Sequence, residues 1–237
     1  MDLNADLGEG GLEDASLMPY LTSCSIACGG HFGTKESITK AIALAQEHGL
    51  AVGAHPAYPD PENFGRYSLN IPLADLQKSL ASQLELFAAV CQEHQTTWQH
   101  IKPHGALYND LAKDEKLADA VLEVFATFSV KGLFLPAKMP VVDRARKQGF
   151  CVWEEVFADR QYSPTGNLVS RSKAGAVLSD IPAVLNQVTQ WVEGGVQTHT
   201  GSRFTAAWDT LCLHSDTPNA VDIARALNDH FSFKKLT

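Results

Sequence analysis

The sequence predicts an α/β fold, a seven-stranded (β/α) barrel of the TIM-like type. Strand-like apolar stretches alternate with amphipathic helical stretches along the 237 residues, a pattern typical of βαβ crossovers and a parallel sheet. The first loop, Gly8-Glu9-Gly10-Gly11, lacks the GxGxxG turn of a dinucleotide fold, and the sequence contains no P-loop motif. Polar side chains follow the predicted strands at their carboxyl ends, where barrels carry their active sites. These observations favour a closed barrel over an open, doubly wound sheet.

Seven segments have the apolar or alternating character of strands. They are residues 2–7, 24–30, 50–55, 98–104, 132–137, 151–158 and 210–215. Amphipathic helices are predicted between and after them, at residues 35–48, 72–94, 114–128, 139–148, 181–194 and 218–230. We expect Thr34 to cap the first helix and Gly49 to end it. Pro72 suits the first position of the second helix, and Thr217-Pro218 suits the start of the last one.

One region interrupts the alternation of strands and helices. Residues 195–208 contain several glycines and threonines, and they predict a short hairpin before the last strand. No charge block, low-complexity tract or linker divides the chain. We therefore expect a single barrel domain over residues 1–237.

Composition and charge bear on partners and location. The chain has 19 Lys+Arg against 27 Asp+Glu, a net charge of −8, which argues against a nucleic-acid partner. No apolar run approaches the roughly 20 residues of a membrane helix, so no membrane association is expected. The N-terminus lacks a basic segment and an apolar segment, so no secretory signal is expected. Five cysteines without a CxxC pair predict free thiols in a reducing cytoplasm.

The first strand has polar residues at every second position. Asp2, Asn4 and Asp6 share one face, and the residues between them are apolar. The apolar face should pack against the helices, so the polar face should point into the barrel. Buried carboxylates are costly unless they are paired or functional. A single buried Asp is ordinary, but three polar residues in one short strand favour a site.

Histidines and a lysine stand at the ends of other strands. They are His31 after the second strand, His55 in the third, Lys102 and His104 in the fourth, and His214 with Asp216 in the last. Taken singly, each histidine is more often a hydrogen-bonded structural residue than a catalyst or a ligand. Taken together with Asp6 on the inward face, they favour an active site at this end of the barrel.

The sixth strand and the loop after the third strand add further candidates. Alternation places Glu155 and Asp159 on one face of the sixth strand, beside Arg160. A catalytic role and a structural salt bridge to Arg160 or Arg171 are about equally compatible with this pattern. The loop 55–66 carries aromatic residues and an arginine, and such loops often cover small acidic ligands. A proline-stiffened surface loop would look the same.

The cysteines leave one alternative open. Cys28 and Cys212 lie near the predicted site, and a thiol nucleophile there is compatible with the sequence. A packing role is the simpler interpretation for Cys28, because it lies opposite in parity to Gly29. Cys91 and Cys151 are expected to be buried as small hydrophobic residues.

Seven segments, in this order along the chain, resemble the LamB/YcsF family. They are residues 2–9, 27–31, 53–60, 64–66, 102–109, 155–160 and 213–216. The family usually has Cys, Asp, Arg and Gly where this chain has Ala5, Thr34, Tyr67 and Ser215. The resemblance implies a seven-stranded β/α barrel related to polysaccharide deacetylases and certain sugar hydrolases.

The same resemblance implies a reaction and partners. It implies ATP-dependent hydrolysis of 5-oxoproline (pyroglutamate) to L-glutamate, as the A subunit of a multi-subunit 5-oxoprolinase. ATP would be a co-substrate together with Mg²⁺, and the 5-oxoprolinase B and C subunits would be the partners. With no P-loop in the sequence, the ATP site would lie on a partner or at the barrel mouth.

Roles for the candidate residues follow from the chemistry of this reaction. Asp6 or His55 would be the general base for water attack, and Lys102 would neutralise an oxyanion or a phosphate. His104 and His214 would donate protons to the leaving nitrogen. Arg66 or Arg160 would hold the substrate carboxylate. The full set of expected substrate-binding residues is Asn4, Glu9, His31, Tyr58, Arg66, Glu155, Arg160 and Asp216.

Two other functions are compatible with the sequence. In the first, the chain is a metal-dependent amide hydrolase or deacetylase that works without ATP. Asp6, His31, His55 and His214 would then bind a divalent metal ion that activates water, with Zn, Mn or Ni equally suitable. In the second, the barrel is a carrier that binds a small carboxylate and passes it to a partner. The number of inward ionisable residues argues against a pure carrier.

Overall fold

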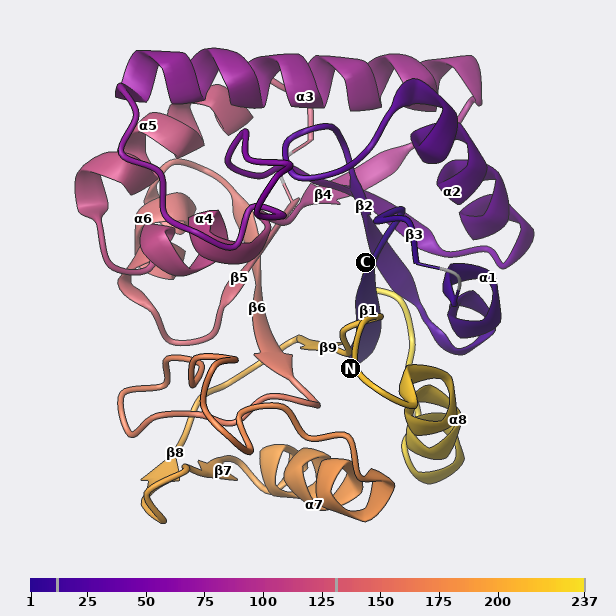
Figure 1. The fold of residues 1–237 in the computed structure, drawn as a ribbon, viewed down its shortest axis with the longest axis vertical. Coiled ribbons are helices and arrows are strands. Elements are labelled where there is room, and N and C mark those ends of the chain that lie inside the picture. The colour runs from indigo at the N-terminus through magenta and orange to yellow at the C-terminus, as the bar shows by residue number, and fades with distance from the viewer. Residues whose placement is uncertain (12, 131, 237) are drawn as a thin grey trace.

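A computed structural model describes residues 1–11, 13–130 and 132–236, and the described strands form a closed, seven-stranded parallel barrel (Figure 1). In order around the barrel they are β1 (Asp2–Leu7), β2 (Ser23–Ala27), β3 (Ala51–His55), β4 (Trp98–Ile101), β5 (Gly132–Pro136), β6 (Cys151–Phe157) and β9 (Thr210–Cys212). The three-residue β9 closes the barrel, because it pairs with β6 on one side and with β1 on the other. The predicted fold class is confirmed.

Several strands end earlier than predicted, for local reasons. After β4, Lys102 N still donates to Ala54 O and His104 N to Pro56 O, but Pro103 between them has no N–H to contribute. After β2, Gly29 turns the chain with a positive φ of 114°. His31, Lys102, His104 and His214 are therefore loop residues just beyond the strands, whereas Asp6 and His55 lie within their strands.

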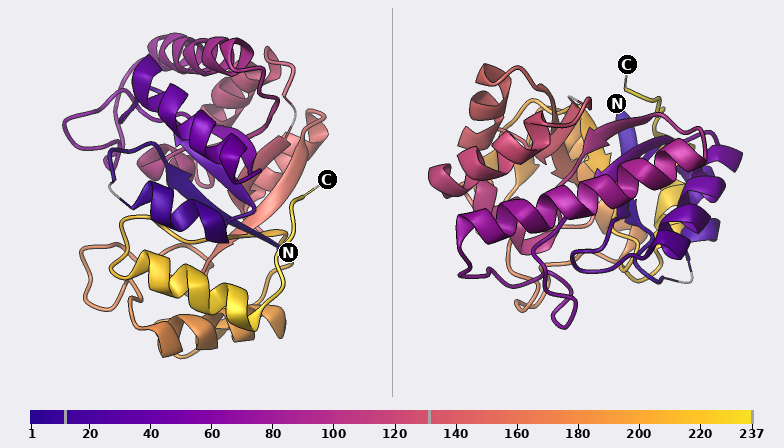
Figure 2. Two further views of the ribbon diagram at one scale, coloured as in Figure 1. Left: turned by 90° about the vertical axis from the view of Figure 1, so that its right-hand side faces the viewer. Right: turned by 90° about the horizontal axis from the view of Figure 1, so that it is seen from above.

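Helices form an outer layer around the strands (Figures 1 and 2). The described helices are α1 (Asp14–Leu17), the 3-10 helix η1 (Met18–Tyr20), α2 (Lys35–Glu47), α3 (Leu73–Glu93), α4 (Gly105–Leu111), α5 (Glu115–Ala126), α6 (Pro140–Lys147), α7 (Ile181–Val192) and α8 (Ala220–His230). All six predicted helices are present, while α1, η1 and α4 were not predicted. These three have only four, three and seven residues, so they lack a long periodic pattern.

Two predicted helix starts need correction. Pro72 is the N-cap of α3 and not its first helical residue. Asn219, with a φ of 64°, caps α8, so Thr217 and Pro218 precede the cap. Thr34 does cap α2, where its side chain accepts a hydrogen bond from Ser37 N.

The segment between β6 and β9 replaces a simple crossover. It contains two isolated antiparallel bridges, one between Arg160 and Val177 and one between Tyr162 and Leu168. Helix α7 follows, and then the antiparallel pair β7 (Val196–Gln197) and β8 (Arg203–Phe204). The predicted hairpin at residues 195–208 is confirmed. Among the described residues, no helix is both long and apolar enough to cross a membrane.

The barrel interior is polar, as the alternation in the first strand predicts. Leu3, Ala5 and Leu7, on the outward face of β1, belong to the apolar core. On the inward face, Asp2 accepts hydrogen bonds from Thr22, Ser23 and Thr210. One level higher, His100 Nε2 lies 3.0 Å from Ser25 Oγ. These interior polar groups are therefore paired with one another, and Ser25 and His100 meet across the intervening strand β3.

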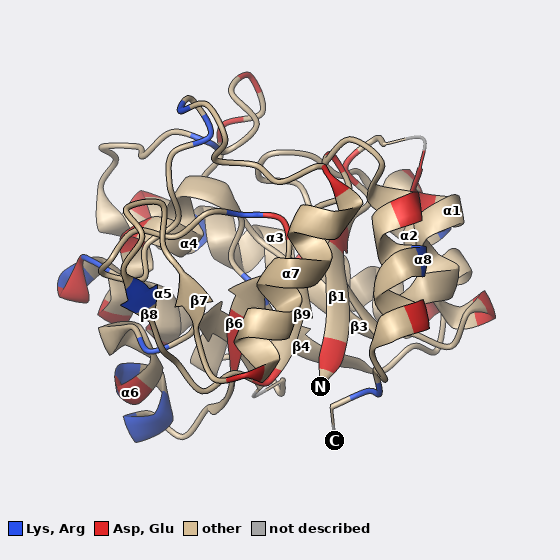
Figure 3. Cartoon of the chain, turned by 90° about the horizontal axis from the view of Figure 1, so that it is seen from below, with Lys and Arg blue, Asp and Glu red and all other residues tan. Residues whose placement is uncertain are grey.

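Glycine makes room for one of these interior groups. A Cβ on Gly53 would lie 2.2 Å from the His100 ring, which is stacked on Phe134 at a centroid distance of 3.9 Å. The missing side chain therefore lets a large ring fill the barrel at this level. On the outside, charges of both signs are spread over the helices, with Lys and Arg gathered on α6 (Figure 3).

Candidate active site

A cavity of about 580 Å³ opens at the carboxyl ends of the strands. Nine residues selected from the sequence line it: Asp6, Glu9, His55, Arg66, Lys102, His104, Arg160, His214 and Asp216. Asn4 and Glu155 lie beneath it in the barrel, where Asn4 Nδ2 donates to Glu155 Oε1 over 2.9 Å. We refer to this space as the mouth cavity.

Lys102 is the buried centre of the site. Its ammonium lies 2.9 Å from Asp6 Oδ1 and 2.8 Å from Glu155 Oε1, and only 2% of the side chain is exposed. Burial disfavours the charged form, but the carboxylates outweigh it and hold the pKa of Lys102 well above its usual range. Lys102 is therefore a fixed positive charge at the floor of the mouth cavity.

Asp6 links this charge to the cavity. Burial would raise its pKa, but the positive charges that His55 and Lys102 can carry outweigh burial, and the pKa of Asp6 is lowered. Asp6 Oδ2 lies 3.4 Å from His55 Nε2. The Asp6 side chain is 10% exposed against 1% for His55, so Asp6 is the more accessible of the two predicted bases.

Three histidines and Glu9 form a second cluster beside Asp6. His55 Nε2 lies 2.9 Å from His104 Nδ1, and Glu9 Oε1 accepts a hydrogen bond from His31 Nε2 over 2.7 Å. Burial lowers the pKa of His31 and of His104 to about 4. Burial also raises the pKa of Glu9 to about 7. Shifts of this size are typical of functional sites.

His214 is held by a residue outside the predicted set. Its Nδ1 donates to Asp159 Oδ1 over 2.9 Å, and Asp159 also accepts a hydrogen bond from Thr217 Oγ1. Asp159 is fully buried, which alone would raise its pKa, but His214 and these hydrogen bonds lower it. This arrangement fixes the His214 tautomer and leaves Nε2 available. Sequence alternation placed Asp159 beside Glu155, but it gave no reason to pair it with His214.

The predicted metal ligands divide between two groups. His31 and His55 belong to the cluster with Glu9 and His104, whereas Asp6 and His214 come together with Cys212. The four residues therefore do not converge on one point as a single ligand set. Tyr58 does not line the mouth cavity: its side chain is almost completely buried, and its hydroxyl donates to Oδ2 of Asp110, which does line it.

The cysteines near the site are not activated thiols. Cys28 belongs to the apolar core, and burial raises its pKa. Cys212 Sγ lies 3.2 Å from Lys102 Nζ, yet burial still raises its pKa well above the usual range. Cys91 is buried as predicted, but Cys151 is exposed because it is the first residue of β6, at the opposite end of the barrel.

Arginines form the rim of the mouth cavity. Arg66 and Arg171 both pair with Asp216, at 2.7 Å and 3.0 Å. Arg160 donates from its Nη2 to Val169 O. Its buried Nε has no hydrogen-bond partner in the part of the chain that the structure describes. Burial lowers the pKa of Arg160. The alternative of a salt bridge from Asp159 or Glu155 to Arg160 or Arg171 is not among the described ion pairs, in which Asp159 pairs with His214 and Glu155 with Lys102.

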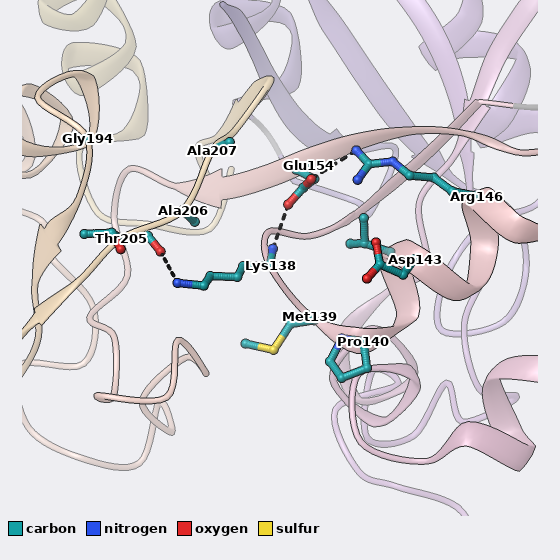
Figure 4. A pocket seen from close by; sticks show the side chains of 11 residues that line it. Lys138, Met139, Pro140, Asp143, Arg146, Glu154, Gly194, Thr205, Ala206 and Ala207 are labelled. Atoms are coloured by element: carbon teal, nitrogen blue, oxygen red, sulfur yellow. Dashed lines mark hydrogen bonds and ion pairs between the residues drawn. The ribbon is translucent and has the colours of Figure 1, made fainter.

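A second cavity, of about 820 Å³, lies between α6 and the β7–β8 hairpin (Figure 4). There Glu154 accepts a hydrogen bond from Lys138 N and pairs with Arg146 at 3.0 Å. Lys138 Nζ donates to Thr205 O. Because these charged groups already neutralise one another, the chemistry concentrates in the mouth cavity.

Comparison with known proteins places the chain in a family. The family model described as LamB/YcsF matches residues 1–237. The chain belongs to the LamB/YcsF family. Curated relatives from Neisseria meningitidis serogroups C, A and B, each named as the A subunit of 5-oxoprolinase, are 41% identical over 229 residues. The matches cover 96% of this chain and 94% of each relative.

A solved structure supports the LamB/YcsF fold. The crystal structure of a lactam utilization protein from Thermus thermophilus matches with a TM-score of 0.90 and 30% sequence identity. The match covers 100% of this chain and 99% of that protein. The family resemblance predicted from the sequence motifs is confirmed.

Proposed function

We propose that this chain hydrolyses the cyclic amide of 5-oxoproline to give L-glutamate, in a reaction coupled to ATP hydrolysis. The similarity over nearly the whole chain to relatives named as the A subunit of 5-oxoprolinase carries the proposal. The mouth cavity supports it, since it combines a carboxylate, a buried ammonium and arginines within one small space. The chain acts as an A subunit with B and C partner subunits.

The chemistry requires activation of a poor electrophile. A lactam carbonyl becomes reactive when its oxygen is phosphorylated by ATP, which is supplied with Mg²⁺. Asp6 then removes a proton from the attacking water as the new C–O bond forms. Lys102 stabilises the negative charge that develops on oxygen. When the C–N bond breaks, His214 donates a proton to the ring nitrogen and an acyl phosphate remains. A second water molecule then hydrolyses the acyl phosphate and releases inorganic phosphate.

The ATP site is assigned to a partner subunit or to the mouth cavity. The sequence contains no P-loop, so a Walker-type site on this chain is excluded. Equilibrium dialysis of the isolated chain with MgATP separates the two positions. All five cysteines are free thiols in the structure, which supports our proposal of a cytoplasmic location.

Arg160 is the best-placed anchor for the substrate carboxylate. It lines the mouth cavity, and its buried Nε is without a partner among the described residues. A charge-assisted hydrogen bond contributes about 1.5–3 kcal/mol. Arg160→Gln is therefore expected to raise the KM for 5-oxoproline by about ten- to a hundredfold, with kcat little changed.

Steady-state kinetics of the assembled enzyme measure this effect. Arg203→Gln is the matched control, because Arg203 is exposed on β8 outside the mouth cavity. Arg160→Lys keeps the positive charge but not the guanidinium that donates to Val169 O. It therefore separates the effect of the charge on KM from the effect of that hydrogen bond. A fall in kcat at unchanged KM would contradict the assignment.

The proposed function is tested by glutamate release from 5-oxoproline. The expected result is stoichiometric ATP hydrolysis and glutamate formation when the chain is combined with its partner subunits. Neither product should form in quantity when this chain is omitted. Glutamate formation at the same rate with and without ATP would contradict the proposed coupling to ATP hydrolysis.

A second function is favoured by one observation, the cluster of His31, His55, His104 and Glu9. In that case the chain is a metal-dependent amide hydrolase or deacetylase that works without ATP. Deacetylation of N-acetylated sugars by the isolated chain, stimulated by a divalent metal ion, would support this function. Strict dependence on ATP and partners would exclude it.

A further inference from the structure

Two histidine rings in the mouth cavity direct lone pairs at each other. His55 Nδ1 lies 2.7 Å from the Lys102 carbonyl oxygen, and His104 Nε2 lies 2.9 Å from the Phe64 carbonyl oxygen. A carbonyl oxygen only accepts, so both of these ring nitrogens carry a proton. In neutral rings the remaining nitrogens, His55 Nε2 and His104 Nδ1, therefore hold lone pairs.

These two nitrogens are 2.9 Å apart. Two lone pairs repel at that distance unless a proton or a cation lies between them. Both rings are almost completely buried, and burial disfavours an extra proton on either of them. The arrangement is therefore incomplete, and a bound cation would complete it.

A carboxylate oxygen converges on the same point. Glu9 Oε1 lies 3.3 Å from His104 Nδ1 and 3.8 Å from His55 Nε2. Glu9 follows β1, His55 ends β3 and His104 follows β4, so a closed parallel barrel brings them to one end. Two imidazoles and one carboxylate are a common ligand set for first-row transition metals.

His31 has a supporting role in this cluster. Its ring is stacked on His104 with a centroid distance of 3.6 Å and an interplanar angle of 4°. In-plane lone pairs of two parallel rings do not aim at one point, so His31 is poorly oriented as a third imidazole ligand. Its Nε2 instead donates to Glu9 Oε1 over 2.7 Å, which orients the carboxylate.

We propose that His55 Nε2, His104 Nδ1 and Glu9 bind one divalent transition-metal ion, such as Zn²⁺, with an open position toward the mouth cavity. Metal–nitrogen bonds of about 2.0–2.1 Å place tetrahedral ligands about 3.4 Å apart. The two nitrogens therefore need to separate by only a few tenths of an ångström. The carbonyls of Lys102 and Phe64 hold the rings in the required tautomers.

This ligand set differs from the one predicted from the sequence. Asp6 Oδ1 is engaged by Lys102, and its Oδ2 lies 3.4 Å from His55 Nε2, but Asp6 is not part of the group of ligand atoms around Glu9, His55 and His104. His214 is oriented by Asp159. His55 alone is common to both sets. The proposal concerns metal binding and does not depend on the lactam reaction, so the two can fail separately.

Metal binding to the chelator-treated chain tests the proposal. Isothermal titration calorimetry with Zn²⁺ is expected to show that one ion binds per chain. Bound Co²⁺ is expected to give the visible absorption spectrum of an ion with a low coordination number. Glu9→Gln and His104→Gln should each weaken binding by more than about 100-fold, since even the loss of an outer partner costs 10–100-fold. Circular dichroism and thermal unfolding check that each variant is folded.

Two control variants make the result specific. His94→Gln removes a histidine at the end of α3, and His214→Gln removes the histidine of the Asp6–Cys212 group. Both are expected to keep tight binding at one ion per chain. The proposal is overturned if the wild-type chain binds no ion, or if only His214→Gln abolishes binding. It is also overturned if nitrogen NMR of the metal-saturated chain shows a proton between His55 and His104.

Discussion

Replacing Lys102 with Met is expected to abolish turnover and to destabilise the fold together. Lys102 is 2% exposed and separates two buried carboxylates, Asp6 and Glu155, at 2.9 Å and 2.8 Å. Removing the ammonium leaves both acids buried without their counter-charge. The loss of one partner of a buried ion pair costs about 3–5 kcal/mol, a large part of the stability of an ordinary domain.

Urea unfolding and turnover in the assembled enzyme measure the two effects separately. The double variant Lys102→Met with Glu155→Gln removes one of the two stranded charges, so it should regain part of the lost stability. It should not regain turnover, because the positive charge is still missing from the floor of the mouth cavity. A single Lys102→Met variant as stable as the wild type would show that Lys102 does not neutralise these acids.

The second large effect is expected for Asp6→Asn. Because neighbouring positive charges lower its pKa, Asp6 is ionised at neutral pH and can accept a proton from water. Asparagine has nearly the same shape but is not a base. Turnover is expected to fall by about 10²–10⁴-fold, the usual contribution of a general base, while the chain stays folded because Lys102 keeps its contact with Glu155.

Glu155→Gln provides the comparison for Asp6→Asn. Both substitutions remove one carboxylate from Lys102, but Glu155 lies beneath the mouth cavity whereas Asp6 lines it. The loss of turnover should therefore be smaller at Glu155. Full turnover in a folded Asp6→Asn enzyme, assayed with its partner subunits, would show that Asp6 is not the base.

The barrel and its polar interior could be predicted because both depend on short periodicities. The alternation of Asp2, Asn4 and Asp6 with apolar residues defined the inward face of β1 before any contact was known. Long amphipathic helices such as α3 were equally visible. The short helix α4 was not, because its seven residues are too few to show a helical period. The prediction of a single domain over residues 1–237 stays a prediction.

The pairing of the site residues could not be predicted, because it depends on loop geometry. Sequence alternation brings His214 and Asp159 to the same end of the barrel, but their contact, and that of Thr217 with the same carboxylate, depends on the path of the loop after β9. In the same way, the stacking of His31 on His104 depends on loops after two different strands. Periodicity assigns a residue to a face, and it carries no information on the path of the chain beyond the strand.

The paired polar groups inside the barrel limit which single substitutions this sequence can tolerate. Ser25 and His100, or Asp2 and Thr210, satisfy each other across strands that are far apart in the chain. Changing one member alone leaves a buried polar group without its hydrogen-bond partner. Changing both to apolar residues of similar volume can leave the stability nearly unchanged. Substitutions in the barrel interior should therefore be epistatic, so that homologous barrels exchange these residues in pairs and seldom one at a time.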